Sequence, residues 1–407
     1  MSNLNRTIGV LVAAGLTLAA CSSDDIDRVG SEDATTSTPG TDVAPSSAAP
    51  GPTTDSAAET VEDEDATATT EAAETTEPVE AAEVTETITL VVYESFPTEE
   101  TPINDQLAAF TDETGIAVEI LVAGDAGTML SKAELTAGNP EGDVMWGIDN
   151  SFLTRAIASE IFEPYVADGL DSIDERFTAL VPNGEATPVD FGDVCVNYDI
   201  AALEGLGVEP PTTLDDLIDP AYADLLVVQN PATSSPGLAF LLATIDEYGQ
   251  DGWQPYWASL VDNGVSVTDG WTDAYYGEFT YAGGDRPLVV SYGSSPPFEV
   301  LFGEGLTEAP TGVVESTCFR QVEFAGVLAG TDQPDAARQL IDFLISEPFQ
   351  AEVALNLFVF PVNTDVELDQ TFTDFAVIPD ESREVEPDVV DANREDWIDE
   401  WTDLVIG

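Results

Sequence analysis

From residue 87 onward the chain alternates between two hydrophobic patterns, and this alternation limits the folds open to it. Short β-branched or apolar runs predict strands, and amphipathic runs predict helices. Such an alternation is typical of βαβ units, so we expect an α/β fold with a mostly parallel sheet. The expected strands are 87–96, 116–124, 142–149, 193–200, 223–231 and the start of 287–302, which then runs into a loop. The expected helices are 102–115, 128–138, 151–162, a helical pair over 333–356, and 394–405.

The N-terminus carries an export signal. Arg6 supplies a positive region, and the apolar run Ile8 to Ala20 is too short to span a membrane as a stable helix. The segment 1–21 ends in Leu-Ala-Ala-Cys and resembles a bacterial lipoprotein signal, which implies that Cys21 becomes the lipidated first residue. The alternative is a plain secretory signal with a chance cysteine. Either way the protein is exported, and we expect it to be periplasmic or anchored by its lipid to the outer face of the cell membrane.

Residues 22–86 are rich in Ser, Thr, Ala, Pro, Glu and Asp and contain almost no large apolar side chain. Such a composition cannot bury a core, and its like charges repel one another. We expect a disordered tether between the anchor and a folded body. The remaining length is enough for two domains of ordinary size.

The charge of the chain excludes several partners. It has 79 acidic and 10 basic residues, a formal net charge of −69, and no histidine. Nucleic acid is excluded because binding its phosphates requires clustered Lys and Arg. The acidity suits a saline habitat or reflects a lineage bias, and it would also attract a cationic ligand. Without histidine the commonest general base is missing, so we expect a protein that is not an enzyme, with no cofactor and no metal.

Two cysteines remain after the signal, Cys195 and Cys318. An even number of cysteines in an exported protein favours a disulfide. The alternative is a nucleophilic Cys195, but no histidine is available to activate it.

The stretch "NPATSSPGLAFLLATIDEYG", residues 230–249, places three hydroxyls directly before an apolar helix. The first turn of a helix has unpaired N–H groups and favours negative charge, so Thr233, Ser234 and Ser235 are candidates for holding an anion or an alcohol. The alternative is a set of N-cap residues that only begins the helix.

Seven stretches from about residue 87 to the end carry a resemblance to a known family, and they are "VYESF", "GDVMWGIDNS", "NPATSSPGL", "VTDGWTDAYYGEF", "LVVSYGSSPPFEV", "QVEFAGV" and "FPVN". In these stretches the chain resembles the thiamine-binding proteins of bacterial ABC importers. The resemblance implies a two-lobed periplasmic-binding-protein fold with two hinge crossovers and the ligand in the interlobe cleft. The crossovers would fall near residues 191–199 and between 292 and 324, with lobe 1 at 87–192 plus about 320–407 and lobe 2 at 193–319.

The resemblance also implies how each part of thiamine is held. Aromatic faces attract the cationic thiazolium, a tyrosine and a carboxylate suit the aminopyrimidine, and the hydroxyl-rich stretch meets the hydroxyethyl or phosphate arm. The predicted ligand-binding residues are Tyr93, Asp125, Asp149, Asn150, Thr233, Ser234, Ser235, Trp271, Tyr275, Tyr292, Ser295, Phe298 and Phe358. Tyr276 and Ser294 are weaker candidates. Phe298 and Phe358 stand where better-known members have a tyrosine and a tryptophan, which reduces the aromatic area.

The expected function is therefore capture of thiamine, or of its phosphate esters, by a monomer that delivers it to an ABC permease. The alternatives are a receptor for a polyamine or other organic cation, a ferric-ion receptor that uses Tyr275 and Tyr276, and a thiaminase-like enzyme with a nucleophilic cysteine. We expect thiamine itself as the cargo, because a neutral set of hydroxyls accepts an alcohol as readily as a phosphate.

Overall fold

The structure is a computed structural model that describes residues 82–98 and 100–407. The expected signal, the lipidated Cys21 and nearly all of the expected tether lie outside the described residues. The first described backbone is already bonded to the body of the protein, because the Ala82 N–H donates to the Asp112 carbonyl at 2.8 Å. The first strand then begins at Glu86.

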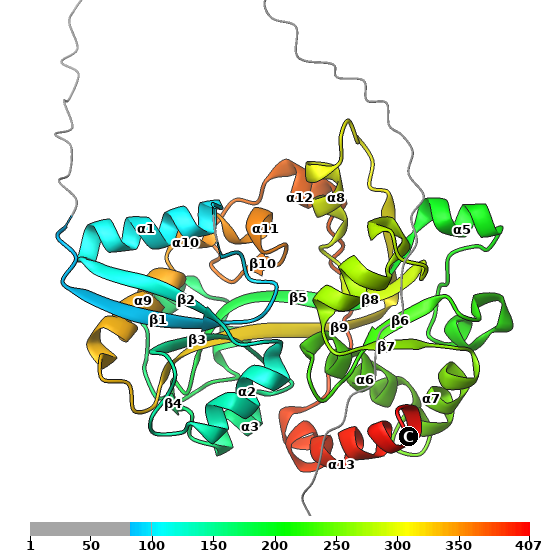
Figure 1. Ribbon diagram of the computed structural model, residues 1–407, viewed down its shortest axis with the longest axis horizontal. Coiled ribbons are helices and arrows are strands. Elements are labelled where there is room, and N and C mark those ends of the chain that lie inside the picture. The colour runs from blue at the N-terminus through cyan, green and yellow to red at the C-terminus, as the bar shows by residue number, and fades with distance from the viewer. Residues whose placement is uncertain (1–81, 99) are drawn as a thin grey trace, which may run out of the picture. The chain divides into compact units, whose positions relative to one another are not determined.

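One ten-stranded sheet runs through the described residues (Figure 1). Its main path has the order β2-β1-β3-β9-β5-β8-β6-β7, while β4 pairs with β9 and β10 pairs with β5. Pairing is parallel at the two ends of this path and antiparallel where β9 and β5 join them. The sheet is thus mixed, and the expected mostly parallel sheet was wrong, because two long strands return through it in the opposite direction.

The strands and helices expected in the first part are present. The strands there are β1 (Glu86–Val92), β2 (Ile116–Val122), β3 (Val144–Asp149) and β4 (Phe162–Glu163). The helices are α1 (Pro102–Thr114), α2 (Ala126–Leu135), α3 (Leu153–Ala158) and the short α4 (Glu175–Thr178). Helix α1 shows why the ends of the helices could be predicted from the sequence. Pro102 occupies its first turn, where the missing N–H has no hydrogen bond to lose, and Gly115 ends the helix at φ 74°.

The middle of the chain builds the other end of the sheet. Its strands are β6 (Leu226–Gln229), β7 (Ser266–Thr268) and β8 (Leu288–Tyr292). Its helices are α5 (Ile200–Leu206), α6 (Ser235–Tyr248), α7 (Trp253–Asp262), a π-helix over Asp273–Glu278, and α8 (Pro296–Phe302). Helix α8 corrects the expected loop after β8, since Pro296 and Pro297 lie in its first turn, where the fixed φ of proline suits a helix.

The strands β5 (Thr187–Asp199) and β9 (Thr311–Leu328) lie side by side in the centre of the sheet (Figure 1). They overlap the two stretches in which the crossovers were expected, 191–199 and 292–324. Their antiparallel register shifts between Val194 and Val196, and at this point Cys195 and Cys318 form a disulfide with a Cα–Cα distance of 4.1 Å. The predicted disulfide is confirmed. The predicted boundaries of the two lobes stay a prediction.

The last part of the chain returns to the first. The expected helical pair consists of α9 (Pro334–Leu344), α10 (Glu347–Gln350) and α11 (Val353–Asn356), followed by β10 (Phe360–Pro361), α12 (Gln370–Phe375) and α13 (Pro387–Val405). None of the helices within the described ranges is long and apolar enough to cross a membrane.

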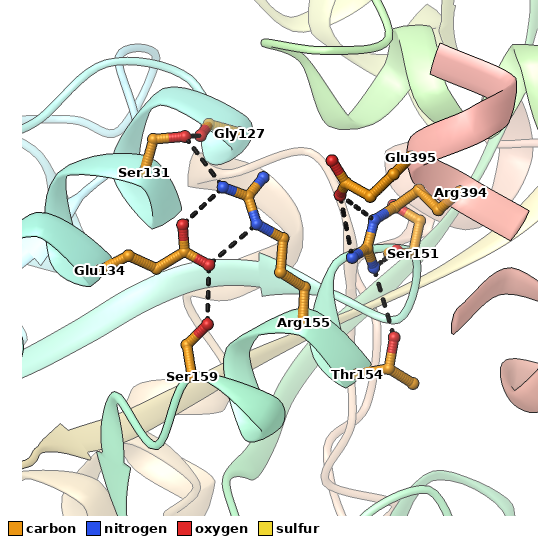
Figure 2. A network of polar contacts seen from close by, with 9 residues as sticks. All are labelled: Gly127, Ser131, Glu134, Ser151, Thr154, Arg155, Ser159, Arg394 and Glu395. Atoms are coloured by element: carbon orange, nitrogen blue, oxygen red, sulfur yellow. Dashed lines mark hydrogen bonds and ion pairs between the residues drawn. The ribbon is translucent and has the colours of Figure 1, made fainter. Parts of the chain in front are cut away.

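Helix α13 is attached to both ends of the sheet. Its Trp401 packs edge-on against Trp257 of α7, with ring centroids 5.3 Å apart. Its buried Arg394 donates to the Ser151 carbonyl at 3.4 Å and to Thr154 Oγ1 at 3.3 Å, beside α3 (Figure 2). Figure 2 also shows a neighbouring group, in which Arg155 of α3 forms an ion pair with Glu134 of α2 at 2.6 Å. Arginine side chains therefore fix α2, α3 and α13 to one another.

Candidate functional site

A pocket of about 300 Å³ is lined by two groups of side chains, which come from opposite ends of the sheet. One group of lining residues comes from the ends of β1 and β3, the start of α2, β9 and the loop after α11. The other comes from the starts of α6 and α8, the π-helix and β8. The lining side chains belong to Tyr93, Glu94, Ser95, Pro97, Asp125, Ala126, Gly147, Ser235, Pro236, Trp271, Thr272, Tyr275, Tyr276, Tyr292, Ser295, Phe298, Glu323, Asn356, Leu357, Phe358 and Val359. The set contains no Lys or Arg.

One wall is a stack of aromatic rings. Trp271 and Tyr275 are nearly parallel, with centroids 4.8 Å apart and an interplanar angle of 20°. Tyr276 meets the Trp271 ring edge-on at 5.5 Å. The Trp271 indole N–H donates to Ser291 Oγ at 2.9 Å, which fixes the ring plane. A wall of this kind presents negative ring faces to a flat cation.

A buried carboxylate supports this wall from behind. The Tyr275 hydroxyl donates to Glu299, which also accepts from the Thr311 hydroxyl at 3.2 Å. Burial raises the pKa of Glu299 to about 7, although these two hydrogen bonds act in the opposite direction. Burial also raises the pKa of Tyr275 well above its usual range, so the ring stays neutral.

Phenylalanine rings close another side of the pocket. Phe298 meets Phe358 at a right angle, with centroids 4.9 Å apart. Phe358 has a positive φ of 55°, which is rare for a bulky residue. Its carbonyl accepts from the Ser294 hydroxyl at 2.6 Å. Ser294 therefore holds the backbone of Phe358, and this weaker candidate is not among the lining residues.

Asp125 joins the two sides of the pocket. It precedes α2 and accepts from the Ala126 N–H at 3.1 Å, as an N-cap does, and from the Trp271 N–H at 3.2 Å. Burial raises the pKa of Asp125, while the Ser234 hydroxyl and these two N–H groups lower it. The carboxylate thus binds a residue 146 positions away along the chain and keeps one edge in the pocket.

The three hydroxyls before α6 have different environments. Ser235 lines the pocket and donates to Asp149 of β3. Thr233 donates to the Asp269 carbonyl at 2.5 Å. Ser234 is fully buried, and its hydroxyl acts on Asp125 by lowering the pKa of that carboxyl group, although its Oγ is within hydrogen-bond geometry of none of the described residues. Only Ser235 can therefore touch a ligand directly in this arrangement.

The structure brings most of the predicted site residues together. Nine of them line the pocket: Tyr93, Asp125, Ser235, Trp271, Tyr275, Tyr292, Ser295, Phe298 and Phe358. The other four, which are Asp149, Asn150, Thr233 and Ser234, do not line it. Asn150 instead accepts from the Val322 N–H at 2.9 Å and donates to the Arg320 carbonyl at 3.2 Å, which pins the end of β3 to β9. Asp149 is buried behind Ser235 and Ser151, and burial raises its pKa.

Sequence reasoning missed Glu94, Glu323 and the backbone around Leu357. Glu323 is the more informative of these because it is the one charged residue in "QVEFAGV", a stretch that the resemblance had already singled out. An acidic residue in a buried strand is a signal of function, because burying a charge without a partner is costly.

The match to a known family covers more than half of the chain. Residues 142–380 match the profile described as "Bacterial extracellular solute-binding protein". The chain is a bacterial extracellular solute-binding protein. This membership confirms the expected kind of protein and its place outside the cytoplasm, and it fits the pocket, which lies between two parts of an α/β fold.

Several relatives of this solute-binding protein are thiamine-binding periplasmic proteins. The thiamine-binding periplasmic protein of Salmonella typhimurium is 28% identical over 314 residues, which is 77% of this chain and 92% of the relative. The protein of that name from Haemophilus influenzae is 30% identical over 276 residues, which is 68% of this chain and 79% of the relative. A solved structure of a periplasmic thiamin binding protein has a TM-score of 0.69 at 27% identity, and the match covers 78% of this chain and 96% of that one. These matches confirm the expected family and the two-lobed fold.

Metal binding finds no support in the pocket. Among residues 82–98 and 100–407, no three His, Cys, Asp or Glu side chains are grouped as a metal site would require. Tyr275, one of the two tyrosines of the ferric-ion alternative, is already bonded to Glu299. Cys195 is buried, lies in the disulfide and is not among the lining residues, so the nucleophile of the thiaminase-like alternative is missing from the described pocket.

Proposed function

We propose that this solute-binding protein captures thiamine in the pocket and delivers it to an ABC permease. The observation that carries the proposal is the stacked wall of Trp271 and Tyr275, which faces a pocket that contains three carboxyl groups and no basic side chain. A permanently charged, flat heteroaromatic ring is the ligand that such a lining stabilises. The relatives that bind thiamine support the same ligand for this chain.

The lining also supports thiamine itself over its phosphate esters. Phosphate recognition commonly uses Lys or Arg, and the pocket contains neither. Ser235 and Ser295 can bond to an uncharged alcohol, while Glu94, Asp125 and Glu323 oppose an added negative charge. We propose that the esters are tolerated with lower affinity.

Calorimetric titration of residues 82–407 with thiamine, its monophosphate, its diphosphate and putrescine tests the proposal. We expect the tightest binding for thiamine and the weakest for putrescine, which is charged but has no ring to stack. No heat with any thiamine species at concentrations up to about 1 mM would overturn the proposal. Tighter binding of putrescine would favour the polyamine alternative instead.

Substitution of the central ring tests the placement of the cation. Trp271→Ala removes the stacking face and should weaken thiamine binding by about 2 kcal/mol, or roughly 30-fold. Trp271→Phe, which keeps an aromatic ring, should weaken thiamine binding less than Trp271→Ala. Tyr276→Ala is the matched comparison, because Tyr276 is 48% exposed and meets the stack only by its edge. Equal losses for Trp271→Ala and Tyr276→Ala would show that the stack is not where the cation binds.

The lipid anchor at Cys21 and the monomeric state also belong to the proposal. The lipoprotein-like signal supports the anchor. Labelling with a fatty-acid analogue in a bacterial host, with Cys21→Ser as the control, tests it. Sedimentation of residues 82–407 with and without thiamine tests the monomer.

A further inference from the structure

Two carboxyl groups face each other beneath the pocket. Asp190 of β5 and Glu323 of β9 are direct partners in the antiparallel register, next to a bulge at Pro188. Asp190 is 1% exposed and Glu323 is 7% exposed. Glu323 lines the pocket, while Asp190 lies behind it. The proposed ligand site therefore has a pair of acids in its floor that the aromatic wall does not need.

Only half of the acceptor oxygens in this pair are used. Asp190 Oδ2 accepts from the Trp146 indole N–H at 3.0 Å, and Glu323 Oε1 accepts from the Gln321 amide at 2.9 Å. The other two oxygens, Asp190 Oδ1 and Glu323 Oε2, are buried and have no donor among the described residues. A carboxyl proton between the two acids satisfies both oxygens at once, as in other carboxyl pairs that share a site.

No positive charge within residues 82–98 and 100–407 compensates the pair. None of the ion pairs between described residues includes Asp190 or Glu323. Arg320, also on β9, is bound to Asp193 at 2.8 Å. The titratable groups that face the pair from the neighbouring segments are acids and phenols, namely Tyr93, Asp125, Asp149 and Tyr292.

These surroundings favour the protonated form. Burial raises the pKa of Asp190 to about 7. Burial raises the pKa of Glu323 well above its usual range, and the charges of Asp190, Asp149 and Asp125 add to the effect. A cation placed in the pocket acts in the opposite direction, because it favours the charged form of a nearby carboxyl group.

We propose that the Asp190–Glu323 pair is the charge-recognition element of the pocket, which is protonated when the pocket is empty and releases a proton when a cationic ligand enters. The carboxyl O–H bond breaks, its electron pair stays on the carboxylate oxygen, and the proton passes to the solvent. The ligand itself is not changed. The inference rests on the proposed function, since thiamine supplies the cation.

This exchange selects the ligand by its charge. A neutral ring of the same shape cannot stabilise the ionised pair and so gains nothing from it. Coupling between two sites is reciprocal: the factor by which the cation weakens proton binding equals the factor by which proton loss strengthens cation binding. A shift of one pKa unit corresponds to about tenfold in affinity, so thiamine should bind about tenfold more tightly at pH 8 than at pH 6.

Calorimetry in buffers of different ionisation enthalpy measures the released protons directly. With the full chain and thiamine at pH 7, we expect net proton release. Glu323→Gln and Asp190→Asn each place an amide N–H donor opposite the remaining carboxyl group, and a hydrogen bond to the carboxylate favours its charged form already in the empty pocket. Most of the release at pH 7 and most of the affinity gain between pH 6 and pH 8 should therefore disappear. Circular dichroism shows whether each variant is folded. If one of the two variants misfolds, the other still tests the inference.

Asp342→Asn is the matched control. Burial also raises the pKa of Asp342, but its partner is Tyr165, and it is not a lining residue. The control should release as many protons as the unaltered protein. If the unaltered protein binds thiamine without releasing protons, or if both pair variants release as many as the control, the inference is overturned and the proposed function stands. If the unaltered protein does not bind thiamine, both are overturned.

Discussion

At the scale of single residues, the pocket depends on acids that are held away from water. Glu299 is 1% exposed, bonds to Tyr275 and Thr311, and has no basic partner among the described ion pairs. Its position behind the aromatic wall fixes the ring of Tyr275 against Trp271. Burying Glu299 lowers the stability of the folded state when this group is ionised, because a buried carboxylate without a cation is unstable.

This cost predicts a pH-dependent stability. The pKa of Glu299 is raised from 4.5 to about 7, so between these values the folded state binds a proton that the unfolded state has lost. Glu299 therefore lowers the free energy of unfolding as the pH rises through that window. Glu299→Gln keeps an acceptor for Tyr275 and a donor for Thr311, and should raise the free energy of unfolding by about 1–3 kcal/mol at pH 8.

Urea denaturation at pH 4.5 and pH 8 measures the effect. The gain of Glu299→Gln should vanish at pH 4.5, where the native carboxyl group is already neutral. An equal gain at both pH values would show that shape and not charge is responsible.

At the scale of elements, the start of α6 is fixed by close contact with β6. A Cβ on Gly237 would lie 2.5 Å from the Gln229 carbonyl oxygen, so only glycine allows the helix to approach the strand. This approach carries Ser235 into the pocket and places it against Asp149. The position of the hydroxyl thus depends on a residue with no side chain.

Gly237→Ala should therefore displace α6 and lower the free energy of unfolding by about 1–3 kcal/mol. It should also weaken thiamine binding, because Ser235 moves with the helix. Gly205→Ala in α5 is the control, since nothing lies within 4 Å of its Cβ position, and it should raise stability by roughly 0.5–1 kcal/mol. Thermal unfolding of both variants checks the prediction, and a similar shift for the two would contradict the contact argument.

Local patterns in the sequence predicted the helices and strands well, but they did not predict how these elements pair and pack. The expected helix at 102–115 corresponds to α1 because Pro102 and Gly115 mark its ends within the chain itself. The antiparallel direction of β5 and β9 depends on pairing between residues more than 100 positions apart, which no local pattern contains. The position of Ser235 beside a ligand was predicted from the local sequence. Its hydrogen bond to Asp149 was not predicted, because the two residues lie 86 positions apart.

In the pocket too, some residues could be predicted from the sequence and others only from the fold. Trp271, Tyr275 and Tyr292 could be chosen from their residue type and from the resemblance, and all three line the pocket. Glu323 could not be chosen in this way, because its importance comes from Asp190 on another strand and from burial that only the folded chain creates.

At the scale of the whole molecule, the disulfide closes a loop with a sequence separation of 123 residues. A cross-link over so long a loop restricts the unfolded chain strongly, so Cys195→Ser with Cys318→Ser should lower the free energy of unfolding by about 2–4 kcal/mol. Urea denaturation of the double variant, beside the unaltered protein without reductant, measures the loss. Equal midpoints would contradict the prediction. Thiamine affinity of the folded double variant should change little, because neither cysteine lines the pocket.

The disulfide lies where the register of β5 against β9 shifts, in the two strands that connect both ends of the sheet. A covalent bond at that point fixes the register of the two strands, so neither strand can slide along the other. Where hydrogen bonds between β5 and β9 open, the two ends of the sheet therefore stay joined by a covalent bond at its centre.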